Sequence, residues 1–371
     1  MATTKGTLFV CSIISLQTAI GVEVSLQSTP GFDSNPLRLN EDLLPEGAMF
    51  SENRLTLDHK IGDALSIKFR AQATSFEEKL RDANRESLSS RFIYRIDPSK
   101  SSTVKFSGSM GLSDKTYVSR STGQIAQFSG QDIGDRYDYN WQGLELDYRF
   151  RLNKIHRFDV EVILQSRDYH DYTNLGLSNR DYTQFELASS WRYKITKEWT
   201  VKNSFEYQFR DYLDREALDL GGNSIANSQL AYQYQGVSSE LIWKVTKEHR
   251  VFAKFSYIDK SDNASGYYDT ESLRFNAEWV WSPNKTDKIR VRWRYSDLKS
   301  SSTPLEDELD DTDGLDTVGS TLTLQGQKAL WNVAGGRVSV LGRFQSYSYD
   351  AQQSIYTYDR NKFYLGLVLD W

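Results

Sequence analysis

Apolar and polar side chains alternate along most of the chain after residue 21. In residues 362–371, KFYLGLVLDW, the side chains of Phe363, Leu365, Leu367 and Leu369 share one face, and the residues between them form the other face. A period of two is that of a β-strand with one apolar face. The same alternation recurs in residues 185–195, 273–281 and 289–295. The pattern therefore predicts a series of amphipathic strands.

The connections between these strands alternate between short and long. Short turns are predicted near residues 62–63, 97–101, 153–156, 196–198, 246–248, 282–287 and 332–336. Longer polar stretches lie near residues 35–48, 76–88, 115–136, 168–181, 211–228, 259–270, 297–316 and 348–355. Strands counted around these breaks number about 16, with both ends of the sheet on one side, as in a transmembrane antiparallel β-barrel. Residues 22–371 are therefore predicted to form one all-β barrel domain.

A weak internal repeat supports hairpins as the building unit. The segment WRYKITKEW at 191–199 is echoed by IWKVTKEH at 242–249. Each copy reads as the end of one strand, a tight turn and the start of the next strand. No linker or helical heptad pattern divides the chain after residue 21.

The first 21 residues have the pattern of a signal peptide. Lys5 precedes the apolar stretch TLFVCSIISL at 7–16, and the small residues Ala19 and Gly21 occupy the positions that signal peptidase reads. Cleavage is predicted after Gly21, which would export the chain and remove Cys11, the one cysteine. The apolar stretch is too short to span a bilayer as a helix. A buried N-terminal strand or helix is the alternative interpretation.

Composition separates a membrane barrel from other classes. With 26% charged residues and a mean hydropathy of -0.59, the chain is not a helical membrane protein. A net charge of -5 opposes nucleic-acid binding. Tryptophans gather at strand ends beside the predicted short turns, as in a bilayer interface, whereas the polar strand face carries too many charges for a dry core. These tryptophans are Trp191, Trp199, Trp243, Trp279, Trp281 and Trp371. A soluble all-β fold is the alternative.

Two segments of the chain carry a resemblance to a known group of proteins. Residues 31–37 read GFDSNPL, and the sequence ends in an alternating strand that closes on Trp371. In these features the chain resembles the β-barrel porin families of Gram-negative bacteria. Members of these families often open with a Gly-aromatic-Asp-Ser-Asn-Pro segment, in which Phe32 stands where Tyr is commoner. The resemblance implies an outer-membrane location and a link to exopolysaccharide export. It also implies that Trp371 is part of the signal read by the barrel-assembly machinery.

The polar face predicts a basic lumen in an acidic chain. Inward lysines and arginines outnumber inward carboxylates, and Arg290, Arg292 and Arg294 form an uninterrupted ladder. A positive channel of low dielectric concentrates anions. The alternative is that most of these charges pair across neighbouring strands and only hold the wall. The predicted basic pore-lining residues are Arg70, Arg95, Arg149, Arg192, Arg274, Arg290, Arg292, Arg294, Arg337 and Arg343.

Two external segments have competing interpretations. The acidic run at 306–316 is interpreted as a solvated loop, with divalent bridging to lipopolysaccharide phosphates as the alternative. A cluster of tyrosines is interpreted as an interfacial girdle, and stacking on passing sugars is the alternative. These tyrosines are Tyr347, Tyr349, Tyr356 and Tyr358.

The function predicted from these features is a porin-like outer-membrane channel for anionic or sugar-type solutes, with a possible place in exopolysaccharide export. A closed barrel that scaffolds an export or assembly complex is the alternative. An enzymatic barrel would have to use His170 with Asp168 or Asp171, and no hydrolase or paired-histidine zinc motif occurs. No enzymatic activity, cofactor or metal is therefore expected. Expected partners are outer-membrane lipids and lipopolysaccharide, the barrel-assembly machinery, and polysaccharide or secretion components, with no nucleic acid.

Overall fold

The computed structural model describes residues 22–43, 46–120, 122–301, 315–333 and 336–371. The predicted signal peptide, residues 1–21, lies outside these ranges. The strands are β1 (Val22–Asp33), β2 (Ala48–Ile61), β3 (Leu65–Phe76), β4 (Arg85–Ser99), β5 (Ser102–Lys115), β6 (Gln127–Phe128), β7 (Gln131–Asp132), β8 (Tyr139–Arg151), β9 (His156–Tyr169), β10 (Tyr182–Lys194), β11 (Trp199–Tyr212), β12 (Ala231–Lys244), β13 (His249–Asp262), β14 (Thr270–Trp281), β15 (Lys288–Ser300), β16 (Thr317–Val333), β17 (Gly336–Ala351) and β18 (Tyr358–Asp370). Short 3-10 helices include η1 (Glu41–Leu43), η2 (Glu78–Ala83), η3 (Thr173–Leu175) and η5 (Ser354–Tyr356). None of the described helices is long and apolar enough to cross a bilayer.

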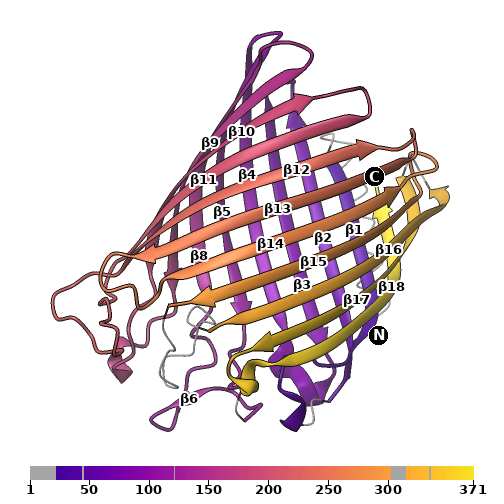
Figure 1. Cartoon of the computed structure of the whole chain (residues 1–371). Coiled ribbons are helices and arrows are strands. Elements are labelled where there is room, and N and C mark those ends of the chain that lie inside the picture. Colours follow the sequence, from indigo (N-terminus) through magenta and orange to yellow (C-terminus); the bar gives the residue numbers. More distant parts are fainter. Residues whose placement is uncertain (1–21, 44–45, 121, 302–314, 334–335) are drawn as a thin grey trace.

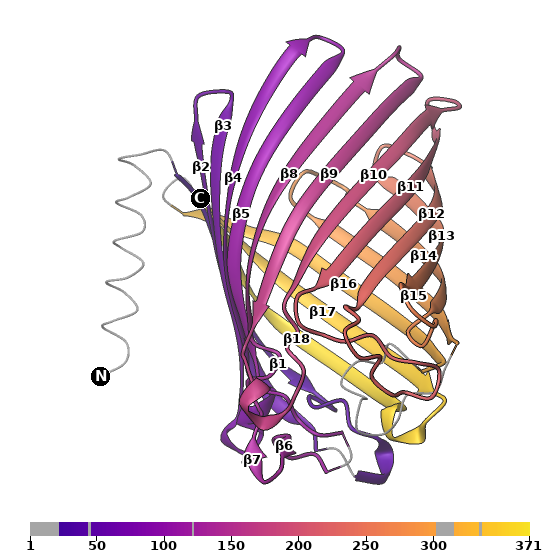
Figure 2. The same cartoon turned by 90° about the vertical axis from the view of Figure 1, so that its left-hand side faces the viewer.

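Sixteen of the described strands close into one antiparallel barrel. Each strand pairs with its neighbours in sequence order, β5 pairs with β8, and β18 returns to pair with β1. The small β6–β7 hairpin lies outside this sheet. Figures 1 and 2 show the tilted strands closing into a barrel. The all-β barrel and its predicted strand number are confirmed.

The two ends of the barrel differ in their connections. Short hairpins stand at the upper end in both views, near the C-terminus, and the longer connections gather at the lower end (Figures 1 and 2). The long connections fall between the strands at 34–47, 77–84, 116–138, 170–181, 213–230, 263–269, 301–316 and 352–357. Residues 44–45, 121 and 302–314 of these intervals, and with them most of the predicted acidic run at 306–316, lie outside the described residues. Each connection lies within a few residues of a polar stretch predicted from the sequence. The barrel therefore has a short-turn end and a long-loop end.

The internal repeat encodes two matching turns at the short-turn end. The Thr196 hydroxyl accepts hydrogen bonds from the backbone N–H groups of Glu198 and Trp199, both at 3.1 Å. In the second copy, Thr246 accepts the same bonds from Glu248 and His249 at the same distance. A threonine that satisfies two turn N–H groups fixes the backbone of a short hairpin. The repeat is thus a repeated turn.

The outer face is apolar, with aromatic rings near the short turns. Phe363 and Leu365 are about half exposed, each at 52%. The rings of Trp199 and Trp243 stack with centroids 4.9 Å apart. His156 and His249 follow two of the predicted short turns as the first residues of β9 and β13, and they stack on neighbouring aromatic rings. These two histidines therefore add to the aromatic belt at the short-turn end.

The GFDSNPL segment closes the barrel between β1 and β18. The Asp33 carboxylate is fully buried and accepts hydrogen bonds from Nε of Arg360 at 2.8 and 3.1 Å. The Asn35 amide donates to the carbonyls of Leu39 and Asp359 at 2.7 and 3.2 Å. These polar side chains join the loop after the first strand to the start of the last strand. The segment therefore has a structural role in this chain.

The last residue is joined to the first strand. The backbone N–H of Trp371 donates to the carbonyl of Val24 at 2.8 Å, and the N–H of Val24 donates back at 3.0 Å. Its ring packs on Gly336, where an added Cβ would lie 2.2 Å from the indole. A side chain at position 336 would therefore displace this ring. The role of Trp371 as an assembly signal stays a prediction.

Candidate functional site

The ten arginines predicted to line the lumen occupy equivalent positions in the strand register. Arg294 of β15 lies opposite Asn276 of β14, and both line the central cavity. The others follow the same alternation: Arg70 on β3, Arg95 on β4, Arg149 on β8, Arg192 on β10, Arg274 on β14, Arg290 and Arg292 on β15, and Arg337 and Arg343 on β17. The register thus places them on the inner face. Their part in solute passage stays a prediction.

The arginine ladder of β15 is only partly free. Glu278 of β14 forms ion pairs with both Arg290, at 3.3 Å, and Arg292. Arg294 has no ion pair among the described residues. The uninterrupted ladder is therefore only partly balanced, because one carboxylate offsets one of its three positive charges. Within the described ranges, Arg294 is the member of the ladder that faces the lumen without a paired carboxylate.

The remaining arginines divide between paired and unpaired. Arg149 pairs with Asp159 at 2.7 Å, Arg95 with Asp97 at 3.0 Å, and Arg337 with Asp370 at 3.2 Å. The amide of Gln325 accepts two hydrogen bonds from Arg343, at 2.7 and 3.1 Å. Arg274 donates to the Ser272 hydroxyl at 3.1 Å. Arg70 and Arg192 have no ion pair within the described ranges. The lumen thus mixes a paired wall with a smaller set of free cations.

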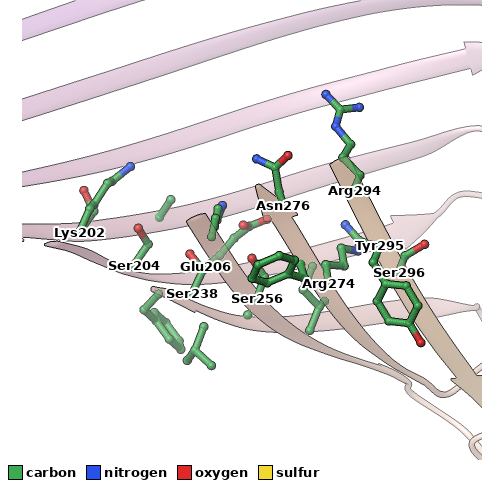
Figure 3. A pocket seen from close by; sticks show the side chains of 18 of the residues that line it. Lys202, Ser204, Glu206, Ser238, Ser256, Arg274, Asn276, Arg294, Tyr295 and Ser296 are labelled. Carbon is green, nitrogen blue, oxygen red and sulfur yellow. The ribbon is translucent and has the colours of Figure 1, made fainter. Parts of the chain in front are cut away.

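The central cavity of the lumen has a volume of about 840 Å³. Its lining includes the serine side chains 204, 238, 256 and 296, which Figure 3 shows near Lys202 and Arg294. A closed sheet of sixteen strands is wider than its inward side chains can fill, and the serines add little bulk to this part of the wall.

Carboxylates and unpaired cations occupy different sectors of this cavity. Its acidic side chains come from β8 to β11 and are Asp147, Asp159, Glu161, Glu186 and Glu206. Two arginines of β8 and β9 lie among them and pair with Asp159. The cations that are free of ion pairs among the described residues come from β11 to β15 and are Lys202, Lys254, Arg274 and Arg294. A lumen with separated charges imposes an electric field across the path of a solute. Alternation along single strands gives the face of each charge but not its sector, so this separation was not predicted.

Three carboxylates in the acidic sector stand close together. Oxygens of Glu145, Asp147 and Glu161 all lie within 4.8 Å of one another. Arg91 of β4 forms an ion pair with Glu145 and supplies part of the balancing charge. At this spacing the three oxygens could all contact one shared cation. The expectation that the chain holds no metal stays untested.

A hydrophobic cluster of tyrosines lies at the long-loop end. Tyr232 and Tyr267 are 1% and 2% exposed, and Leu218 and Leu230 from the 213–230 loop pack with them. Cations lie over the rings: Lys260 Nζ is 3.9 Å from the Tyr232 centroid. Such contacts between cations and ring faces stabilise a partly desolvated cluster. Half of the cluster comes from loops without periodicity, so the alternation of the strands could not reveal it.

The interpretation of the last tyrosines as an interfacial girdle is wrong. Tyr347, Tyr349 and Tyr358 line the central cavity. Tyr356, in η5, is 6% exposed. The rings of Tyr349 and Tyr358 stack with centroids 5.3 Å apart. Tyr347 and Tyr349 share the alternation of Arg343, and this signal could have placed them inside. The tyrosines therefore belong to the lumen.

The candidate enzymatic residues do not form a catalytic group. His170 packs against Tyr172, and no hydrogen bond joins it to Asp168 or Asp171 within the described chain. The Asp171 carboxylate accepts hydrogen bonds from the backbone N–H of Thr173 at 2.8 Å and from the Thr173 hydroxyl at 3.1 Å. These hydrogen bonds lower the pKa of Asp171, which weakens it as a base. These three side chains therefore do not form a hydrogen-bonded acid–base group, and the expectation of no enzymatic activity stays a prediction.

Comparison with known proteins identifies the fold. No protein-family model and no curated relative matches the sequence. Among solved structures, CdiB from Acinetobacter baumannii aligns over 94% of this chain and 60% of its own, with 10% identity and a TM-score of 0.51. The fold is that of an outer-membrane β-barrel. Its apolar outer face and aromatic belt are those of a protein located in the outer membrane.

Other similar structures share this overall architecture. The anion-selective porin from Comamonas acidovorans aligns over 94% of this chain and 98% of its own, with 9% identity and a TM-score of 0.46. A bacterial polysaccharide outer membrane secretin aligns over 94% and 97%, with 10% identity and a TM-score of 0.45. At these identities the likeness does not extend to function, so function has to be argued from the lumen of this barrel.

Glu278 offers a direct test of how pairing affects the lumen. Replacing it with Gln should release Arg290 and Arg292 from their shared carboxylate and increase the net positive charge of the wall. We expect a stronger preference for anions, measured as a reversal potential in a planar bilayer under a salt gradient. The matched control is Glu248→Gln, in a short turn. An equal shift in both variants would contradict the assigned role of Glu278.

Proposed function

We propose that this protein is an outer-membrane channel that selects anionic or sugar-type solutes by pore width and wall charge. The observation that carries the proposal is the central cavity, whose free cations Lys202, Lys254, Arg274 and Arg294 line one sector of an open lumen. A cation in a lumen of low dielectric attracts anions more strongly than one on an open surface. Hydroxyl groups and tyrosine rings on the same wall suit sugar-type solutes.

The deciding experiment is the reversal potential of the refolded protein in a planar bilayer under a salt gradient. We expect a steady conductance with a preference for the anion. Correctly folded protein that gives no conductance would overturn the channel proposal. A steady current that prefers the cation would overturn the part of the proposal that concerns charge.

A closed barrel that scaffolds a complex is the second candidate. The observation in its favour is the tyrosine cluster, in which the 213–230 loop packs over the inner wall at the long-loop end. A scaffold requires a stable wall and no open path. Absence of current in folded protein, together with recovery of a stable complex from cells, would support it.

The finer proposals concern setting and partners. We place this channel within an exopolysaccharide export system, on the strength of the GFDSNPL segment and the polar lumen. The outer face would contact membrane lipids and lipopolysaccharide, and Trp371 would be read by the barrel-assembly machinery during insertion. Removal of Trp371 should lower the amount of folded barrel in the outer membrane without changing transcript level. Unchanged insertion would contradict that role.

A further inference from the structure

A row of basic side chains winds around the inner wall from one end of the barrel to the other. Each of its members is the direct cross-strand neighbour of the next, from the short-turn end of β8 to the long-loop end of β18. Most members are lysine or arginine, and Glu240 is the only acid among them. We call this the basic row: Arg151, Arg157, Arg192, Lys202, Glu240, Lys254, Asn276, Arg294, Thr321, Tyr347 and Arg360.

A second row, with serines on the four adjacent strands β10 to β13, runs directly beside the basic row. We call it the serine track: Ser190, Ser204, Ser238, Ser256, Arg274, Ser296, Gly319, Tyr349 and Tyr358. All of these residues line the central cavity, and Figure 3 shows part of both rows from inside. The hydroxyls of Ser204, Ser238 and Ser256 make no hydrogen bond within the described part of the chain. They remain available to a ligand.

The acidic sector borders one end of the serine track. Asp147, Glu161 and Glu206 belong to the row on its other side, and from β12 to β15 that row continues with uncharged residues. Only the part of the track at Ser190 and Ser204 therefore lies between carboxylates and cations. At that end a ligand carboxylate is repelled from the acidic row and attracted to the basic row.

The long-loop end of the track has the features of an entrance. The stacked rings of Tyr349 and Tyr358 end the track, and the Arg120 guanidinium lies 5.9 Å from the Tyr358 centroid. Buried nitrogens of Arg38 and Arg120 have no hydrogen-bond partner among the described residues. The positive charges of Arg120 and Arg360 act on Arg38, so these guanidinium groups lie near one another. Unsatisfied buried donors at a positive entrance favour an anionic group.

We propose that the serine track and the basic row together form an extended binding surface for an acidic oligosaccharide chain. Strands of a sheet lie about 4.8 Å apart, so the track offers a hydroxyl or a cation at intervals comparable to the length of a pyranose ring. Many similar weak contacts in series hold a chain while letting it slide. This inference rests on the proposed channel function and names its substrate class as polyanionic and polyhydroxylated.

The first test uses oligogalacturonate as the probe and maltooligosaccharide of matched length as the neutral control. We expect oligogalacturonate to block the open-channel current at a lower concentration than the neutral chain. Arg294→Gln should raise the half-blocking concentration by about tenfold, the loss expected for one charge-assisted contact. The matched control is Arg290→Gln, which removes the same charge from the same strand outside the basic row. Equal effects of the two variants would overturn the proposal.

The second test fills the serine track. Ser256→Phe should weaken the block of the channel current by oligogalacturonate, because the larger ring takes up space in the cavity along the track. The control Ser239→Phe adds the same ring to the neighbouring strand on the outer face. Both variants must show the heat-modifiable gel mobility of a folded barrel. Equal block by wild type and Ser256→Phe would show that the chain does not follow the track.

Calorimetric titration of oligogalacturonate into the detergent-solubilised barrel separates this inference from the channel proposal. Heat of binding that Arg294→Gln weakens and Arg290→Gln does not, in a barrel without conductance, would support the binding surface and overturn the channel. Conductance without selective binding or block would support the channel and overturn the binding surface.

Discussion

Replacing Lys254, Arg274 and Arg294 with glutamate is expected to turn an anion-preferring current into a cation-preferring one. All three line the central cavity, and none has an ion pair among the described residues. Each substitution changes the wall charge by two units and removes a cation that has no carboxylate to compensate it. The reversal potential under a salt gradient should therefore change sign.

The matched control is Lys197, Lys247 and Lys285 replaced together with glutamate. These lysines are exposed in short turns and change the net charge of the protein by the same amount. The control should keep the anion preference. Glutamates at Arg290 and Arg292 are less informative, because each would face Glu278 and threaten the fold. A channel whose selectivity is unchanged by the cavity triple would contradict the assigned filter.

Replacing Asp33 with alanine is expected to destabilise barrel closure strongly. Asp33 is fully buried and Arg360 is 8% exposed, so the substitution leaves a buried guanidinium without its carboxylate. Breaking a buried pair by removing one partner costs about 3–5 kcal/mol. We expect a lower midpoint of denaturant unfolding and a lower temperature for the heat-modified gel shift.

Glu23→Ala is the control for this experiment. Glu23 pairs with Lys60 at 2.7 Å, and both side chains are more than half exposed. Water screens such a pair, so its loss should change stability little. If both variants shifted the unfolding midpoint equally, the buried pair would have no special part in closing the barrel.

The strand architecture could be predicted because each strand carries its own signal. Alternation in 362–371 identifies both the strand and its faces without knowledge of its neighbours. The same alternation places Arg294 inside. It cannot show that Glu278 pairs with Arg290 and Arg292, because that contact depends on the register across the 282–287 turn. Free and paired cations therefore could not be separated from the sequence.

Features assembled from many strands were beyond sequence reasoning. Each strand contributes one residue to the serine track, so Ser204, Ser238 and Ser256 are unrelated in the linear pattern. The tyrosine cluster likewise joins strand residues such as Tyr232 to loop residues such as Leu218. Tyr347 is different, since its position relative to Arg343 on the same strand already indicated the inner face. The interpretation of Tyr347 as part of an interfacial girdle gave the aromatic composition of the segment more weight than its alternation.

The contact between the first and last strands sets the order in which the barrel can be completed. The Ser25 hydroxyl donates to Asp370 at 2.7 Å across 345 positions of sequence. Hairpins between strands that are neighbours in the sequence can form locally, whereas the pairing of β1 with β18 requires the whole chain. Until then, β1 and β18 each expose an edge that can pair with another chain. The pairing of β1 with β18 is therefore the step that removes both exposed edges, and the contacts between these two strands act at that step.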